Sequence, residues 1–531
     1  MEVIVNPQII RLNDFAKAGI NSDLMPWDLP GSFVTEVNNV RINRGKLSPF
    51  GGSKVWAELP EGFEPGYNIS LNSDLGTVWV IAGLDKVYAY DGSSFYDISS
   101  DKGYGAIVKA DLWQGDLMSN VLVINNQNST PEYWPSSDTN TNLLPLPWAD
   151  GETWDDVNES CAIIRSHKQF LFALDLYSDG TRIPDGVRWS SPADINSIPS
   201  TWEPTDTTNV AGITNLGGAG GNIVDGKSLR DAFCVYRERG ITVFDFVGGQ
   251  FVWQIRHMSN DVGLISPDSI VEVKGRHYFI GDGDIYINDG NTIESILHDR
   301  LRNRFVSNYD PDNFKNSYAI LNVSSNEIWF CVPEAGNEYP NVAYMYNWRD
   351  DSFSIRDLPG APFASSGKQG TPPVTWDNIT SFWEEAQGGW GQRQLTPLDD
   401  TVIAVTKPLT PESKGELLIL DLDVLTSDNS FSTIIERTGF ALEGLNQVTT
   451  ITRLYPHMNG PGSVLIQIGS QDTAGSPIRW KRPVRFRPGI DRKVDIRTTG
   501  ELHCFRFTSE NNDAYWEVSG VDIEYVKAGT R

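Results

Sequence analysis

The chain has 531 residues, of which 39% are hydrophobic, 11% aromatic and 21% charged, with 48 glycines and 30 prolines. Such a length allows one large body with a smaller module, and the composition favours short strands joined by turns over a helical bundle. The formal net charge of −26 disfavours binding to nucleic acid or to an anionic membrane unless a local patch dominates.

The N-terminal segment, residues 1–7, has no basic stretch followed by an apolar one, and no apolar run approaches the ~18 residues of a membrane span. We therefore expect a soluble protein made in a cytoplasm. The four cysteines lie too far apart for a CxxC metal pattern or a dense disulfide framework, and we expect buried thiols at Cys161, Cys234, Cys331 and Cys504.

One hairpin pattern returns along the chain. An alternating strand runs into a turn of Asp, Asn or Gly, and a second apolar strand follows, at residues 87–98, 241–253, 285–293 and 343–355. Another strand precedes most of these hairpins, as at residues 77–81, 277–280 and 327–332. Two hairpins form a four-stranded blade, and units spaced by about 40 to 60 residues are typical of a propeller.

The sequence therefore predicts an all-β protein, a β-propeller of six or seven blades, some of them irregular, over residues 1–440 with the N-terminal arm. An array of β-sandwiches would give similar hairpins. The resemblance between the units and the absence of an immunoglobulin Cys, Trp, Cys spacing favour the propeller.

Tryptophans are the main candidates for packing or subunit contacts. Three of them recur every seven residues after residue 360, where neighbouring prolines and glycines disfavour a helix. We expect them to fill apolar surface under the blades. The full candidate set is Trp189, Trp202, Trp376, Trp383 and Trp390.

After residue 440 the predicted strands become longer, and residues 441–531 are expected to form a small antiparallel β module. This segment has 12 basic and 10 acidic residues, unlike the acidic remainder. Its most basic stretch predicts a strand that faces a partner, with Arg479, Lys481, Arg482, Arg485 and Arg487. Interleaved aromatic and basic residues could also bind phosphate or stack on bases.

The sequence lacks the common nucleotide-binding, metal-binding and catalytic motifs. It has no P-loop, dinucleotide fingerprint, HExxH motif or GxSxG elbow, and its six histidines are dispersed. The glycine run at residues 217–221 lacks the lysine of a phosphate loop and predicts an inter-strand loop. We expect no catalytic residues, no cofactor and no metal site.

Several segments, in their order along the chain, resemble the tail nozzle proteins of short-tailed bacteriophages, also called DNA stabilisation or tail tubular proteins. They are residues 37–52, 186–192 with Trp202, 275–290 with 300–305, and the tryptophans at 376, 383 and 390. The resemblance covers about residues 30 to 400.

This resemblance implies a virion structural protein and no enzyme. Its subunits would form a homo-oligomeric ring, most often a hexamer, attached to the portal and adaptor rings and to tail fibres or spikes. The ring would close the tail channel, retain packaged DNA and conduct it during ejection, without specific DNA binding or membrane insertion. The alternative function is a propeller glycoside hydrolase or a sugar-binding module for receptor recognition.

Overall fold

The computed structural model describes residues 7–530 apart from 14, 74–75, 105–111, 128, 136–140, 206–208, 250–251, 370–398, 409, 411–412, 423–430 and 511–513. Almost all regular structure in this part of the chain is β-strand. The described helices are one short α-helix, α1 (Arg302–Asn308), and one 3-10 turn, η2 (Phe314–Asn316). None of the described helices has the length and hydropathy of a membrane span.

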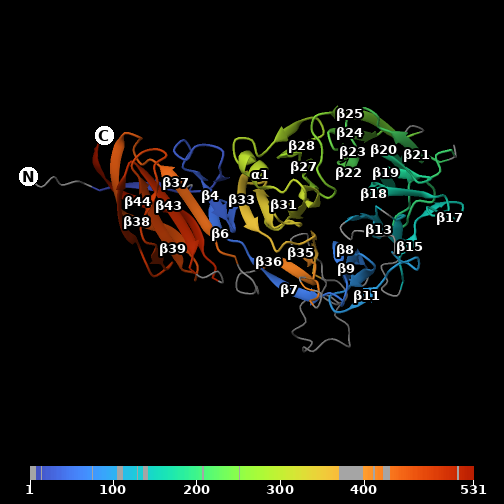
Figure 1. Ribbon diagram of the computed structural model, residues 1–531, viewed down its shortest axis with the longest axis horizontal. Helices are drawn as coiled ribbons and strands as arrows, with labels where there is room; N and C mark the ends of the chain where they lie inside the picture. Colours follow the sequence, from blue (N-terminus) through green and yellow to red (C-terminus); the bar gives the residue numbers. More distant parts are fainter. Residues whose placement is uncertain are drawn as a thin grey trace, which may run out of the picture.

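Seven four-stranded antiparallel units, called blades 1 to 7 here, form the larger body (Figure 1). Blade 1 consists of β8 (Pro65–Ser73), β9 (Gly76–Gly83), β10 (Val87–Tyr90) and β11 (Phe95–Asp97). Blade 2 consists of β12 (Trp113–Met118), β13 (Val121–Asn126), β14 (Glu132–Trp134) and β15 (Leu144–Pro145). Blade 3 consists of β18 (Glu159–His167), β19 (Phe170–Ser178), β20 (Thr181–Trp189) and β21 (Gly212–Asn215).

Blades 4 to 7 consist of β22 (Ile223–Leu229), β23 (Ala232–Arg237), β24 (Gly240–Phe246) and β25 (Trp253–Ser259); β26 (Ile270–Val273), β27 (Arg276–Gly281), β28 (Asp284–Asn288) and β29 (Ile293–Ser295); β30 (Tyr318–Asn322), β31 (Glu327–Val332), β32 (Val342–Asn347) and β33 (Ser352–Asp357); and β34 (Phe363–Lys368), β35 (Asp400–Thr406), β36 (Glu416–Leu422) and β7 (Gly52–Glu58).

The blades close into a ring. The first strand of each blade contacts the first strand of the next, and β34 of blade 7 contacts β8 of blade 1. Blade 7 draws its fourth strand, β7, from the N-terminal side of the chain, where it pairs antiparallel with β36. Closure therefore depends on hydrogen bonds between segments from the two halves of the sequence. The predicted β-propeller is confirmed.

The repeated turns have a shared physical cause. In blade 1 the Asp91 carboxylate accepts hydrogen bonds from the backbone N–H groups of Ser93 and Ser94, and in blade 5 the Asp289 carboxylate does the same for the two residues that follow Gly290. Gly92 and Gly290 have φ of 96° and 94°. An aspartate that caps its own turn and a glycine at positive φ are what this chain reversal requires.

The second body, called the module here, is the predicted antiparallel β module, at the left of Figure 1. One sheet contains β42 (Val494–Gly500), β38 (Gln447–Asn459), β44 (Glu517–Thr530), β6 (Lys46–Pro49), β5 (Val40–Asn43) and β1 (Gln8–Leu12). The facing strands are β4 (Glu36–Asn38), β37 (Ile434–Phe440), β43 (Leu502–Ser509), β39 (Val464–Gln471), β40 (Arg479–Trp480) and β41 (Val484–Phe486).

The pairings add N-terminal segments to this module. The sequence predicts that residues 1–440 belong to the propeller. In the structure β1 and β6 pair with β44 and β5 pairs with β6, while β4 pairs with β37 and also with β33 of blade 6. Pairing between distant parts of a chain leaves no local pattern in the sequence, so these partners could not be read from it. The module is built from both ends of the chain.

A buried group of four charges lies where the chain passes from β5 and β6 to blade 7. The Arg41 guanidinium donates to the Glu327 carboxylate at 2.6 and 2.9 Å and also to Asp421. Arg356, whose side chain is 1% exposed, pairs with Asp421 at 3.2 Å and donates to the Gly51 carbonyl at 3.0 Å. This four-charge cluster connects the N-terminal segment with blades 6 and 7.

One continuous hydrophobic cluster joins blades 5 and 6 to the module. It includes Phe305 of α1, Tyr344 of blade 6, Phe507 of the module and Phe15 of the N-terminal segment. Phe15 and Phe507 pack edge to face with ring centroids 5.7 Å apart. Because apolar burial is the main stabilising contribution in folding, this shared core fixes the module against blades 5 and 6.

Three histidines are buried, and His277 has the most complete set of partners. Its Nε2 lies 2.8 Å from the Ser228 carbonyl and its Nδ1 lies 2.8 Å from the Tyr236 hydroxyl, which accepts a hydrogen bond from Asn288. The neutral ring, donating from Nε2 and accepting at Nδ1, satisfies both contacts. Burial lowers the pKa of His277 to about 4 from 6.5.

We expect acid to destabilise the fold through this histidine. The unfolded chain binds a proton at His277 below about pH 6.5, and the folded chain only below about pH 4, so the stabilisation is complete above pH 6.5 and is lost as the pH falls to 4. The loss is about 3 kcal/mol, because one pKa unit corresponds to about 1.4 kcal/mol. Urea unfolding of His277→Gln should show a free energy that falls less over this range than in the wild type.

The matched control is His298→Gln, since the His298 side chain is 68% exposed. Its pH profile should follow that of the wild type. Parallel profiles for the wild type and His277→Gln would contradict the buried neutral state.

Candidate functional site

The axis of the propeller is a candidate position for a binding or catalytic site, because the first strands of all blades converge there. Arg165 of β18 occupies this region, with a side chain that is 3% exposed. It donates from Nε to Asp225 at 2.7 Å and from Nη2 to Asp268 at 2.9 Å. It also donates to Gln114 at 2.7 Å and to the Gly115 carbonyl at 2.9 Å. One guanidinium thus joins blades 2, 3, 4 and 5.

Both carboxylates bind the Arg165 guanidinium, and Oδ2 of Asp268 is buried without a hydrogen-bond partner among the described residues. Asp225 accepts two hydrogen bonds from Arg165 and one each from the backbone N–H groups of Gly226 and Asp268. Burial raises the pKa of the Asp268 carboxyl, and the Arg165 charge opposes that rise. For Arg165 itself burial lowers the pKa, but the two aspartates outweigh it and raise the pKa. The arrangement is a buried ion-pair network that joins the inner parts of blades 2 to 5.

Removing the guanidinium should destabilise the propeller strongly. In Arg165→Met the Asp225 and Asp268 carboxylates stay buried without their cation, and breaking a buried pair in this way typically costs about 3 to 5 kcal/mol. Thermal and urea unfolding should show that loss.

The triple variant Arg165→Met, Asp225→Asn, Asp268→Asn should recover part of the lost stability, because no uncompensated charge remains. Arg11→Met is the matched control, since Arg11 is 75% exposed in its pair with Asp522 and such pairs contribute about 1 kcal/mol or less. Equal stability of Arg165→Met and the control would disprove the network's role.

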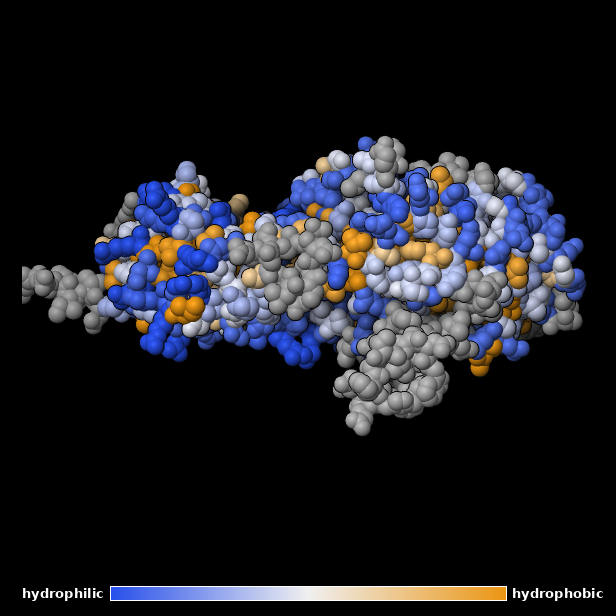
Figure 2. All heavy atoms as spheres, turned by 90° about the horizontal axis from the view of Figure 1, so that it is seen from below, coloured by the Kyte–Doolittle hydropathy of each residue, from blue (hydrophilic) through white to orange (hydrophobic). Residues whose placement is uncertain are grey.

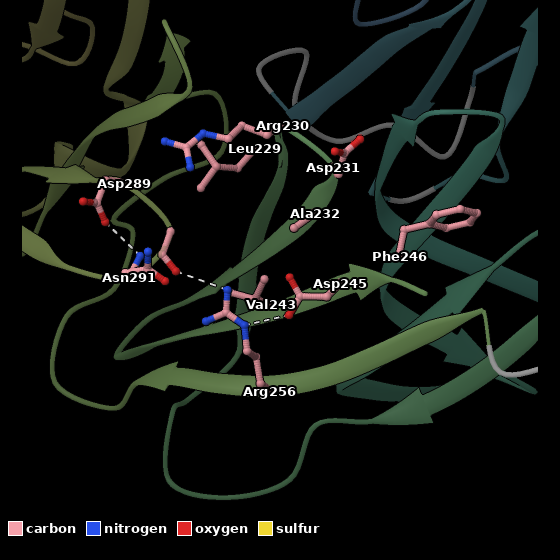
Figure 3. Close-up of a pocket in the computed structure, with 11 residues that line it drawn as sticks. Leu229, Arg230, Asp231, Ala232, Val243, Asp245, Phe246, Arg256, Asp289 and Asn291 are labelled. Atoms are coloured by element: carbon pink, nitrogen blue, oxygen red, sulfur yellow. Dashed lines mark hydrogen bonds and ion pairs between the residues drawn. The ribbon is translucent and has the colours of Figure 1, made fainter. Parts of the chain in front are cut away.

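A cleft of about 260 Å³ lies between blades 4 and 5, where Arg230, Asp245, Phe246, Arg256 and Asp289 are among the lining residues (Figure 3). Arg256 donates to Asp245 at 2.7 Å and to the Gly290 carbonyl at 3.2 Å. The Asp289 carboxylate caps its own turn. Most charged groups of this cleft therefore have partners within it.

A second cleft, of about 210 Å³, contains the buried Glu132 of β14. The Tyr104 hydroxyl donates to Glu132 at 2.8 Å, and burial raises the pKa of this carboxyl. Asp155 also lines the cleft and forms an ion pair with Lys102. A carboxyl with a raised pKa is suited to general-acid chemistry. If the protein is an enzyme, this cleft is a candidate for its active site.

The predicted basic strand lies at an open edge of the module. β40 and β41 both pair with β39 and with no other strand among the described residues. The side chains of Arg479, Lys481, Arg482, Arg485 and Arg487 are all exposed. Three of these have acidic partners, Arg479 with Asp472, Arg485 with Glu510 and Arg487 with Asp491.

The candidate tryptophans have different environments. Trp202 is fully buried and packs edge to face on Trp154 at 5.0 Å. Trp189 is partly buried and donates to the Val210 carbonyl at 2.9 Å. Trp376, Trp383 and Trp390 lie outside the described residues. Trp202 thus packs within its own chain.

The axial network was not predicted from the sequence, although the sequence contains one signal for it. Arg165 and His167 are polar residues in a strand that is otherwise apolar from Cys161 to Ile164. A charge in a buried strand implies a buried partner. The partners Asp225 and Asp268 are 60 and 103 residues away, and only ring closure brings them together.

Metal ligation has no candidate in this part of the chain. Within the described ranges, no group of three or more His, Cys, Asp or Glu side chains is arranged to hold a metal ion. The cysteines Cys161, Cys234, Cys331 and Cys504 are all buried and free, as predicted from their spacing.

No family model matches this sequence, and a search of curated proteins gives no match. Solved structures do resemble the fold. The AfRom2 CNH domain matches with a TM-score of 0.34 and 10% identity, over 70% of this chain and 99% of that one. An exo-β-1,3-galactanase from Phanerochaete chrysosporium matches with a TM-score of 0.25 and 7% identity, over 90% of this chain and 100% of that one.

PorZ, a bacterial surface component of the type-IX secretion system of Porphyromonas gingivalis, matches with a TM-score of 0.34 and 10% identity, over 89% of this chain and 61% of that one. Similarity of this degree transfers no activity, substrate or partner to this chain.

Proposed function

We propose that this chain is a structural subunit of a virion tail, a ring-forming nozzle protein of a short-tailed bacteriophage. The resemblance of its motifs, in order, between about residues 30 and 400 supports this function. In this function the ring, most often a hexamer, attaches to the portal and adaptor rings and to tail fibres or spikes. It closes the tail channel, retains packaged double-stranded DNA and conducts it during ejection.

The binding of the inner carboxylates by Arg165 is the observation that supports a structural role. A hydrolase needs an acid and a base or nucleophile that can reach a substrate. At the described axis the carboxylates of Asp225 and Asp268 are instead bound by Arg165. A propeller with such an axis supports a function that depends on shape and surface charge.

The acidic surface suits a wall along which DNA moves. Duplex DNA carries one negative charge per about 1.7 Å of its axis, so basic side chains would bind it and slow its exit. The net charge of −26 repels the duplex at distances up to about 8 Å at physiological salt.

We expect the purified protein to form a ring and not to bind duplex DNA. Size-exclusion chromatography with light scattering should give a defined oligomer, and fluorescence anisotropy should detect no binding to a short duplex even at low salt, apart from weak contact at the basic strand. A protein that is monomeric at all concentrations, or that binds the duplex tightly, would contradict this function.

The glycoside hydrolase remains the second candidate, and the raised pKa of the buried Glu132 is the observation that favours it. Assays with aryl glycosides should show no turnover if the structural role is right. Turnover in the wild type that is abolished in Glu132→Gln, with unchanged thermal stability, would replace the nozzle proposal with an enzyme. Ser129→Ala, on the same cleft, is the matched control.

A further inference from the structure

The module and the β16 and β17 hairpin of the propeller carry surface patches of opposite charge. We infer that copies of this chain associate head to tail, with the basic end of one copy against the acidic end of the next. The inference rests on the proposed ring function and adds to it the surfaces that meet. The basic end is on the module, and the acidic end is on the hairpin of β16 (Pro147–Ala149) and β17 (Glu152–Thr153), at the opposite end of the molecule (Figure 1).

The basic end has eight basic residues in 19 positions, with only two acidic ones, and it follows β40, β41 and the start of β42. Its members, all exposed, are Arg479, Lys481, Arg482, Arg485, Arg487, Arg492, Lys493 and Arg497. Four of them form ion pairs with acidic neighbours. Lys481, Arg482, Arg492 and Arg497 have no ion pair with any residue in the described ranges, so their charge is available to a partner.

The backbone of this edge is unsuited to strand addition. Pro483 and Pro488 lie next to β41 and have no N–H to donate, and natural sheets use prolines and charges in this way to block edge pairing. A partner therefore binds through the side chains of the basic end. That requires an acidic surface.

The folded molecule has such an acidic surface on the side opposite the module. Between Lys109 and Arg165 there is no basic residue, and there are nine acidic ones. Asp150, Glu152, Asp155 and Asp156 are exposed on the β16 and β17 hairpin and the turn after it. No ion pair engages Asp150 or Glu152 among the residues that the structure describes. These four residues are called the acidic end below.

A tryptophan stack holds the acidic end in place. Trp154 packs edge to face on Trp148 at 5.1 Å and on Trp202 at 5.0 Å, and the backbone N–H of Trp202 donates to the Trp148 carbonyl at 2.9 Å. This stack ties the hairpin to the loop that carries Ile195. A rigid charged surface loses little conformational entropy when it binds.

Each end also presents an exposed isoleucine. Ile490 in the basic end is 68% exposed, and Ile195, in the loop that Trp202 ties to the hairpin, is 79% exposed. Figure 2 shows apolar residues bordered by strongly hydrophilic ones on the module. Apolar groups surrounded by charges are the usual composition of a specific interface, with affinity from the centre and orientation from the rim.

The placement of the two ends determines the kind of assembly. Because they lie at opposite ends of an elongated molecule, the basic end of a copy cannot contact the acidic end of the same copy. Each copy therefore has one basic and one acidic surface that can bind a neighbour. Such a heterologous contact gives a closed ring if the rotation between copies closes, and a filament if it does not. Nucleic acid is a less suitable occupant of the basic end, since the net charge of −26 repels it.

The test uses two neutralised variants, Lys481→Gln with Arg482→Gln at the basic end and Asp150→Asn with Glu152→Gln at the acidic end. Asn tolerates the positive φ of 49° at position 150. Each variant alone should associate about tenfold more weakly than the wild type, by sedimentation velocity at 50 mM salt. A mixture of the two should form dimers that grow no further, because only one intact interface is possible between them.

The control is Lys54→Gln with Lys315→Gln, two exposed propeller cations outside both ends, which should assemble like the wild type. If the wild type assembles and neither end variant changes this, the head-to-tail contact is wrong while the ring function stands. A wild type that stays monomeric at every salt concentration disproves the ring function itself. Tight binding of a short duplex DNA that is lost in the basic-end variant would make nucleic acid the occupant instead.

Discussion

The N-terminal segment crosses from the module to the propeller at Arg41, and the four-charge cluster fixes that crossing. Arg41 comes from the module, Glu327 and Arg356 from blade 6, and Asp421 from blade 7. The two cations and two anions of the cluster pack against one another. If any of the four side chains moved away, an opposite charge would stay buried without its partner. The start of β7, and with it the register that closes the ring, follows from this cluster.

The axial network applies the same physics at the centre of the ring. Arg165 contacts groups from blades 2, 4 and 5, so a shift of any one of these blades would break a charge-assisted hydrogen bond in a dry environment. Hydrophobic packing between blades tolerates some sliding, whereas the guanidinium has a fixed geometry. The network therefore specifies how neighbouring blades are placed, in addition to its contribution to stability.

Local features of the sequence predicted the blades well. Turn residues such as Asp91 and Asp289 act through their own backbone, so their role can be read without knowing the fold. The basic residues at 479–487 were also identifiable, since exposure follows from their charge. The partners of Arg165 and the four-charge cluster could not be predicted, because the residues that meet are far apart in sequence. The function stays a prediction that the resemblance supports.

The origin of β7 has a consequence for how the protein forms during translation. β7 ends at residue 58, and its partner β36 begins about 360 residues later. At roughly 5 to 20 residues per second, the ribosome makes β36 some 20 to 70 seconds after β7. Blades 1 to 6 can form in the meantime from neighbouring hairpins, but β7 waits as a strand without its partner. The high contact order of this one pairing makes closure a late step, and the nascent chain needs protection from aggregation until then.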